Sequence, residues 1–256
     1  MRERLRRAIR ALEGRPETLE EAAGRLPLGL SAVDAALGGG LPRAALHEIL
    51  ASGESETASA AGFALALAAR AAAGRAVLWI AEDMTQRESG VPYGPGIEEM
   101  GLDADAVLLV TAAHPRDVLW AMEEALHCRA VGAVLGEIRK PDAVDDIASR
   151  RLSLAATHGR RPALLLRPQP AVRPAAAATR WIVGAAPSVA VAGEKTAHGA
   201  PGPPTFAVHL VRNRQGRLGS WTLEWNRAEH RFALAPAHSQ PLAAAPFDRP
   251  SPAAVA

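Results

Sequence analysis

The sequence predicts an α/β fold in which a mostly parallel sheet is flanked by helices and followed by a C-terminal antiparallel hairpin. Short apolar runs alternate with longer segments of helical periodicity, which is typical of a parallel sheet with crossover helices. Runs such as 76–81 (AVLWIA) are apolar at almost every position, as strands covered on both faces must be. After about residue 180, alternating apolar and polar residues joined by polar turns predict antiparallel strands.

The elements of the parallel part follow one another in a regular order. Ser31 is a suitable helix cap, and the glycines at 38–40 end the helix that it begins. A later helix is marked by Val118 and Met122 at helical spacing. The expected helices are 31–37, 57–73, 115–129 and 142–158, and the expected strands are 44–50, 76–81, 106–110, 131–135 and 162–166.

The antiparallel part ends in a hairpin whose turn is rich in arginine. Its strands are expected at 179–193, 205–226 and 229–235. Alternation places Trp221, Leu223 and Trp225 on one face of the hairpin. The tryptophans can belong to a core, or they can form a protein-binding anchor with the neighbouring arginines. The candidate partner-binding residues are Arg212, Arg214, Arg217, Trp221 and Trp225.

Composition and length indicate one domain with two tails. The chain has 256 residues and a formal net charge of +2, a globular balance that does not by itself indicate nucleic-acid binding. We expect an N-terminal helix and linker at 1–26, a core with its hairpin at 27–235, and a disordered Pro- and Ala-rich tail at 236–256. DNA contact is therefore expected to be indirect or weak.

Several classes of protein are excluded on sequence alone. The longest apolar stretch, 60–69, is far shorter than the roughly 20 residues that cross a bilayer. The charged N-terminus predicts no secretory signal, and the single Cys128 excludes an internal disulfide and a thiolate zinc site. The histidines show no metal-ligand spacing. We therefore expect a cytoplasmic protein with no metal site and no membrane partner.

A strand, a glycine-containing loop and a helix N-terminus follow one another at residues 46–60, the order that binds phosphates in many nucleotide-binding proteins. Such a loop needs a final glycine, a lysine for the β- and γ-phosphates, and a hydroxyl for magnesium. The loop here contains Ser52 and Gly53 but no lysine, and the nearest lysine in the sequence is Lys140.

The stretch LGLSAVDAALGGGLPRAALHEIL (28–50) resembles the entry to a RecA-like core. In an ungapped register, the resemblance places Thr57 at the final glycine of the phosphate loop, Ala58 at the lysine and Ser59 at the hydroxyl. Alanine cannot replace an ammonium group, and Glu54 and Glu56 would repel a triphosphate. We expect a degenerate phosphate loop, no ATP or magnesium cofactor, and no enzymatic activity.

The resemblance also assigns two carboxylates. Glu82 ends a strand at the place where RecA-like ATPases carry the glutamate that activates water. Glu137 ends another strand, where the family carries an aspartate that positions magnesium. Because the lysine and this aspartate are both replaced, we interpret the core as one retained for shape and not for turnover.

The C-terminal sequence LVRNRQGRLGSWTLEWNRAEHRF (210–232), after such a core, resembles the ImuA family of bacterial damage-inducible mutagenesis proteins, which is related to SulA. The resemblance covers about residues 27–234. It implies an accessory role in SOS-induced translesion DNA synthesis, with direct binding to an ImuB-type inactive relative of Y-family polymerases. It also implies an indirect link to a DnaE-like error-prone polymerase and, in some members, contact with RecA.

Three functions remain open on the sequence: a non-catalytic scaffold, a divergent ATPase that obtains its lysine from elsewhere, and a SulA-like inhibitor of cell division. By analogy with RecA-like assemblies, residues 1–26 are a candidate for self-association. For the scaffold, we expect that truncation after about Gly202 removes partner binding while the core still folds.

Overall fold

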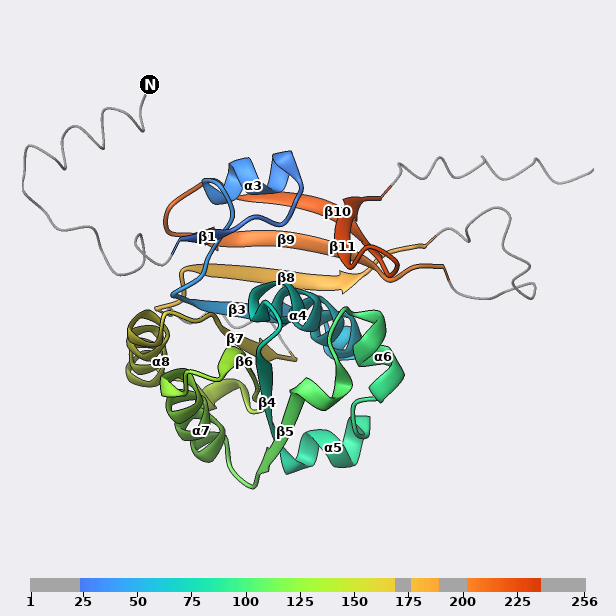
Figure 1. Ribbon diagram of the computed structural model, residues 1–256. Coiled ribbons are helices and arrows are strands. Elements are labelled where there is room, and N and C mark those ends of the chain that lie inside the picture. Colours follow the sequence, from blue (N-terminus) through green and yellow to red (C-terminus); the bar gives the residue numbers. More distant parts are fainter. Residues whose placement is uncertain (1–23, 169–175, 189–201, 236–256) are drawn as a thin grey trace, which may run out of the picture.

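A nine-stranded mixed sheet organises the residues that the computed structural model describes, which are 24–168, 176–188 and 202–235 (Figure 1). The strands of this sheet are β3 (Leu46–Ala51), β4 (Ala76–Glu82), β5 (Val107–Ala112), β6 (Val131–Glu137), β7 (Ala163–Arg167), β8 (Thr179–Ala185), β9 (Thr205–Asn213), β10 (Gly219–Asn226) and β11 (Arg231–Leu234). Their order across the sheet is β11-β10-β9-β8-β3-β7-β6-β4-β5.

The six strands from β5 to β8 are parallel, and helices cover both of their faces. One face packs against α4 (Thr57–Ala72), and the other packs against α7 (Pro115–His127) and α8 (Asp146–Gly159). The two apolar clusters are separated by the sheet, as expected when crossover helices lie on both sides. The predicted parallel α/β core is confirmed.

The C-terminal strands continue the same sheet. β8 was expected among the antiparallel strands, but it pairs parallel with β3 and antiparallel with β9. Strand direction first reverses between β8 and β9, and β10 and β11 then follow as antiparallel neighbours. The hairpin is therefore joined to the core by backbone hydrogen bonds, which the periodicity of one strand cannot reveal.

The N-terminal elements differ from expectation in their detail. α3 (Ser31–Leu37) has the predicted bounds, but Leu30 is its N-cap and Ser31 is already helical. Asp34 instead satisfies the backbone before the helix, because its carboxylate accepts hydrogen bonds from the N–H groups of Leu28, Gly29 and Leu30 at 2.7, 3.0 and 3.2 Å. The predicted linker includes β1 (Arg25–Leu26), which pairs with β2 (Leu41–Pro42).

The structure also changes the predicted set of helices. α8 begins four residues later than predicted because Asp145 caps it, accepting a hydrogen bond from the Ala148 N–H at 2.8 Å. The structure adds α5 (Asp83–Ser89) and α6 (Gly94–Glu99), which the sequence did not predict. The predicted helix at 1–13 and the tail at 236–256 lie outside the described residues. Within the described ranges, no helix combines the length and apolar character that a bilayer crossing requires.

Aromatic side chains hold the C-terminal strands against α4. The ring of Phe63 on α4 lies 5.6, 5.9 and 5.5 Å from those of Trp181, Phe206 and Phe232, measured between ring centroids. Aromatic contacts in this range are stabilising beyond the area that they bury. β8, β9 and β11 therefore share one core with the first crossover helix.

A series of buried polar contacts links β8, β3 and β2. The Trp181 indole donates to the Thr179 hydroxyl at 3.0 Å, and Thr179 Oγ1 lies 2.8 Å from His47 Nδ1. His47 Nε2 lies 2.8 Å from the Pro42 carbonyl oxygen. Burial lowers the pKa of His47 to about 4, so the imidazole is neutral at neutral pH.

Candidate functional site

The loop between β3 and α4 is the predicted phosphate loop, and it closes against β8. The Ser52 N–H donates to the Val183 carbonyl at 2.8 Å. Gly53 has φ −169°, an extended conformation open to any residue, and a Cβ built on it would meet no atom within 4 Å. The loop therefore has no conformational need for its glycine, unlike loops in which the backbone closely approaches a phosphate.

Glu56 adds a fixed negative charge at the start of α4. Its carboxylate Oε2 accepts a hydrogen bond from the Ala185 N–H at 2.6 Å, which joins the loop to the end of β8. Thr57 begins the helix and donates its hydroxyl to the Glu54 carbonyl at 2.8 Å. A carboxylate held beside this helix N-terminus opposes the binding of phosphate there.

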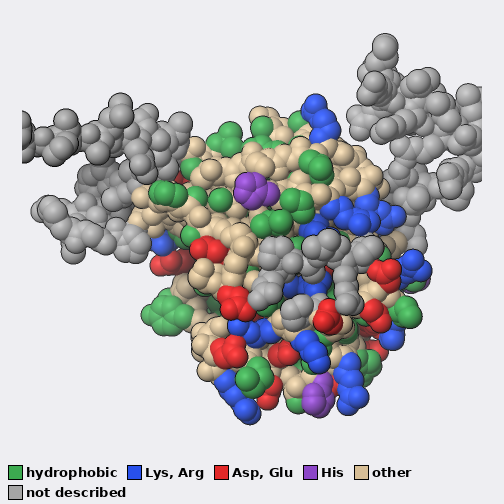
Figure 2. All heavy atoms as spheres, turned by 180° about the vertical axis from the view of Figure 1, so that it is seen from behind, with side chains coloured by type: hydrophobic (Ala, Val, Ile, Leu, Met, Phe, Trp, Pro, Cys, Tyr) green, Lys and Arg blue, Asp and Glu red, His purple; other side chains and the backbone are tan. Residues whose placement is uncertain are grey.

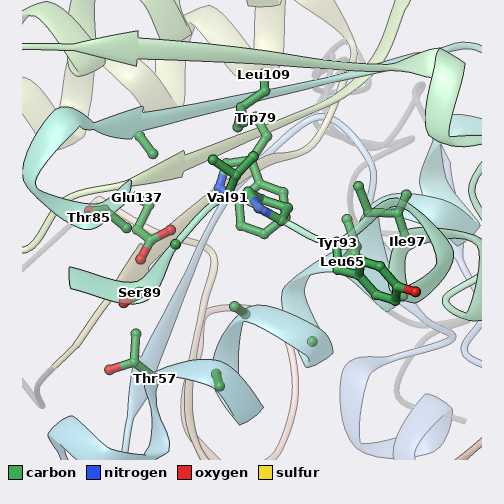
Figure 3. A pocket seen from close by; sticks show the side chains of 17 residues that line it. Thr57, Leu65, Trp79, Thr85, Ser89, Val91, Tyr93, Ile97, Leu109 and Glu137 are labelled. Carbon is green, nitrogen blue, oxygen red and sulfur yellow. The ribbon is translucent and has the colours of Figure 1, made fainter. Parts of the chain in front are cut away.

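A cavity of about 480 Å³ lies between the first half of α4, the carboxyl ends of the central strands, and α5 and α6 (Figure 3). Of the seven assigned nucleotide-site residues, it brings together Thr57, Ala58 and Glu137. None of the described residues that line it is a lysine or an arginine. Apolar side chains form most of its wall, among them Leu65, Trp79, Val91, Tyr93, Ile97 and Leu109.

Two acidic side chains lie at the strand ends beside this cavity. β4 and β6 are neighbours, and Ala81 pairs with Glu137, so Glu82 follows immediately on the adjacent strand. Glu137 is only 5% exposed, and burial raises its pKa to about 7. Trp79 and Arg139 act against this rise, whereas the negative charge of Glu82 adds to it. This carboxyl group therefore titrates near neutral pH.

Glu82 is held in a different way. Its Oε1 accepts a hydrogen bond from the Arg139 N–H at 2.9 Å. The Arg139 guanidinium turns toward α5 instead, with Nη2 2.8 Å from Glu88 Oε2. The guanidinium of Arg139, two residues after Glu137, is thus paired with Glu88 and not with either of the two acids. No cluster of three or more potential metal-ligating side chains occurs in the described part of the chain.

Some residues that line the cavity were not predicted from the sequence to belong to a site. Trp79 was expected only as a strand residue, and its buried indole N–H has no hydrogen-bond partner of normal geometry in the described chain. Tyr93 belongs to a Gly- and Pro-rich segment between α5 and α6. It precedes α6 and lines the cavity with most of its side chain exposed. A neutral, largely apolar group would fit these walls better than a magnesium–triphosphate complex.

No family model matches the chain. The protein ImuA of Caulobacter vibrioides (strain NA1000 / CB15N) is 31% identical over 207 residues, covering 75% of this chain and 80% of that protein. The chain belongs to the ImuA family. ImuA of a second strain of the same species, ATCC 19089 / CIP 103742 / CB 15, matches to the same extent.

A solved structure confirms the fold predicted for this ImuA-family chain. The crystal structure of the RadB recombinase superposes with a TM-score of 0.54 at 13% sequence identity, covering 82% of this chain and all of that one. At this identity the likeness concerns the fold alone. It agrees with the RecA-like core that residues 28–50 predict.

The predicted partner-binding residues of this ImuA-family protein do not form one surface. Trp225 is fully buried, donates its indole N–H to the Glu99 carbonyl at 2.9 Å and packs on Phe232, so it belongs to the core. Trp221 is half-buried, with its ring centroid 6.3 Å from that of Trp181. The expectation of a tryptophan anchor is wrong for Trp225 because alternation points its side chain into the sheet's covered face.

The arginines lie apart from those rings. Arg217 and Arg214 are exposed in the β9–β10 turn, and the Arg217 N–H donates to the Ala36 carbonyl of α3 at 2.9 Å. Arg212 is half-buried on β9 opposite Arg180 of β8. The turn is thus fixed against α3, and Arg212 and Arg214 lie near α8, on the face of the sheet away from the tryptophans.

Proposed function

We propose that this ImuA-family protein is a non-catalytic accessory protein of SOS-induced translesion DNA synthesis, and that it binds an ImuB-type inactive relative of Y-family polymerases. Family membership supports the link to damage-induced mutagenesis, since that is the role implied for the family. The observation that carries the non-catalytic part is Ala58, which stands at the lysine position in a site that contains acids and no described cation.

The electrostatics of the site support this proposal. Glu56, Glu82 and Glu137 surround the start of α4 and the strand ends, so a magnesium–triphosphate complex would meet net negative charge. In a nucleotide-hydrolysing site, a lysine and a magnesium-binding hydroxyl offset the charge of the phosphates. Here only Ser59 retains a suitable group, and one hydroxyl cannot offset the carboxylates of Glu56 and Glu82.

Calorimetric titration of the full-length protein with ATP and magnesium tests the non-catalytic part. We expect no heat of binding at millimolar nucleotide and no phosphate release. Turnover that disappears in Glu82→Gln would contradict the proposal and support a divergent ATPase. A matched ATPase of the RecA type serves as the positive control for the preparation.

A cellular test addresses the accessory role. We expect deletion of the gene to abolish damage-induced mutagenesis, and Glu82→Gln and Ser59→Ala alleles to restore it at normal protein levels. The reason is that neither side chain performs chemistry in this proposal. Loss of mutagenesis in either substituted strain, with the protein folded and abundant, would mean that the nucleotide site is in use.

A further inference from the structure

A second hollow, of about 520 Å³, lies on the face of the sheet opposite α4, between α8 and the end of β9. We call it the arginine hollow, and the residues that line it are Asp146, Arg150, Ser153, Leu154, Ala176, Arg212 and Arg214. None of these residues belongs to the phosphate loop or to the cavity beside it. The arginine hollow is therefore a separate candidate site.

The arginine hollow is assembled by elements that hydrogen bonds hold together. Asp146, Arg150 and Leu154 recur every four residues, so they share one side of α8. The Ala176 N–H donates to the Ser149 hydroxyl of α8 at 2.6 Å, which ties the chain entering β8 to this helix. The Arg214 N–H donates to the Ala178 carbonyl at 3.0 Å, which ties the end of β9 to the same segment.

A β-bulge directs Arg212 into this position. Trp181 pairs with Leu210 and Arg180 pairs with Arg212, which leaves Val211 without an opposite residue. The bulge places two arginines directly across from each other, an arrangement that is unfavourable between like charges. Glu48 compensates Arg180, with its carboxylate 2.6 Å from the guanidinium Nε. Arg212 has no such acid among the described residues, and its buried Nε has no hydrogen-bond partner there.

The balance of charge in the hollow is positive. Arg150 and Arg214 are exposed and, like Arg212, form no ion pair with any described residue, and the lining contains a single acid, Asp146. Guanidinium groups bind carboxylates and phosphates with two parallel hydrogen bonds. The arginines of the hollow therefore favour an anionic ligand.

Exposed aliphatic side chains accompany the arginines, which distinguishes between anionic ligands. Leu154 lines the hollow and is 58% exposed, and Val211, next to Arg212 on β9, is 42% exposed. Figure 2 shows the molecule from behind, where basic, acidic and hydrophobic side chains are intermixed. Arginines interleaved with exposed aliphatic side chains are typical of protein interfaces. The lining has no aromatic side chain on which a base could stack.

We propose that the arginine hollow binds an acidic segment of a protein partner. Carboxylates of that segment pair with Arg150, Arg212 and Arg214, and its aliphatic side chains cover Leu154 and Val211. This inference rests on the proposed accessory function and names the surface through which the ImuB-type partner binds.

Surface plasmon resonance of the full-length protein against the purified ImuB-type partner tests this surface. We compare the natural chain with the triple charge reversal R150E/R212E/R214E at about 50 and about 300 mM salt. Binding by the natural chain is expected to weaken with salt, and the triple variant is expected to bind at least about tenfold more weakly. Leu154→Ser is expected to weaken binding without changing its salt dependence.

Controls separate the site from general charge and from folding. Arg129→Glu reverses another exposed arginine, in the turn between α7 and β6, and is expected to bind as the natural chain does. Because Arg212 is half-buried, R150E/R214E serves as a second variant that changes only exposed side chains, and circular dichroism verifies the fold of each.

Each outcome bears on a different claim. Equal binding by the natural chain and both charge-reversal variants would show that the arginine hollow is not the binding surface, and it would leave the proposed accessory function unaffected. Failure of the natural chain to bind the ImuB-type protein would overturn the accessory function itself. If the reversals instead reduced binding to an oligonucleotide of about 30 nucleotides and spared the partner, the hollow would be a nucleic-acid site and the inference would be wrong.

Discussion

Two buried titratable residues carry pKa shifts of opposite sign. Burial raises the pKa of Glu137 from 4.5 to about 7 and lowers that of His47 from 6.5 to about 4. Protonated Glu137 makes its full contribution to the free energy of unfolding below pH 4.5. This contribution is lost as the pH rises to about 7, because the buried carboxyl group then ionises. The His47 contribution is complete above pH 6.5 and is lost as the pH falls to about 4. The two effects oppose each other between these limits.

We expect Glu137→Gln to increase the free energy of unfolding at about pH 8 and to change it little at about pH 4 to 5. The neutral amide removes the cost of burying a carboxylate, which is on the order of 3 kcal/mol for a shift of this size. Urea unfolding at the two pH values measures the difference. In the variant, the His47 effect is no longer opposed, so stability should fall on acidification.

The exposed Glu98→Gln serves as the matched control, since it removes the same charge without relieving burial. An equal gain from Glu137→Gln at both pH values would show that the substitution acts through packing and not through ionisation.

At the scale of elements, small residues set the distance between α4 and the sheet. Ala60, Ala64, Ala68 and Ala71 are buried on this helix. A Cβ built on Gly132 of β6 would lie 2.6 Å from the Ala72 Cα and carbonyl oxygen, a separation that real structures do not show. The alanine-rich helix and this glycine are two parts of one close contact, although 60 residues separate them.

We therefore expect Gly132→Ala to destabilise the protein by about 1–3 kcal/mol, because the added methyl group would push α4 away from β6. Gly53→Ala in the phosphate loop is the matched control. It places a methyl group in open space at an extended φ, and it should be nearly neutral. Urea midpoints of the two variants give the comparison.

A large loss of stability in Gly53→Ala would contradict the description of the loop as one that needs no glycine. A neutral Gly132→Ala would mean that α4 can shift without cost, in conflict with the close contact between Ala72 and β6.

For the whole molecule, the C-terminal strands are part of the folding unit. The core around Phe63 includes Phe206, Trp225 and Phe232, all of which follow Gly202. This shared core argues against the expectation that truncation after about Gly202 leaves a folded core. Truncation would expose Trp181 and the free edge of β8, and such edges promote aggregation.

We expect the chain that ends at Gly202 to be insoluble or to lack a cooperative unfolding transition, whereas the chain that ends at residue 235 should unfold as the full protein does. Thermal unfolding followed by near-ultraviolet circular dichroism makes the comparison. A cooperative transition in the shorter chain would show that β9–β11 form an independent unit.

Much of the fold was predictable because its signals are local. The bounds of α3, α4 and β4 follow from glycines, apolar periodicity and an apolar run, each confined to a few neighbouring residues. The loss of the phosphate-loop lysine was visible at Ala58 as soon as the register was set. α5 and α6 were missed since their short sequences contain glycine, proline and polar residues that resemble a loop.

Residue identity, spacing and strand or helix periodicity were enough to establish the α/β class, the resemblance to the ImuA family and the missing lysine. Contacts in three dimensions were needed to show that Trp225 belongs to the core, that Glu56 holds the loop against β8 and that Arg212 lies beside Arg150 of α8. These contacts join residues far apart in the chain, and they depend on strand order, a register shift and burial, which no local pattern specifies.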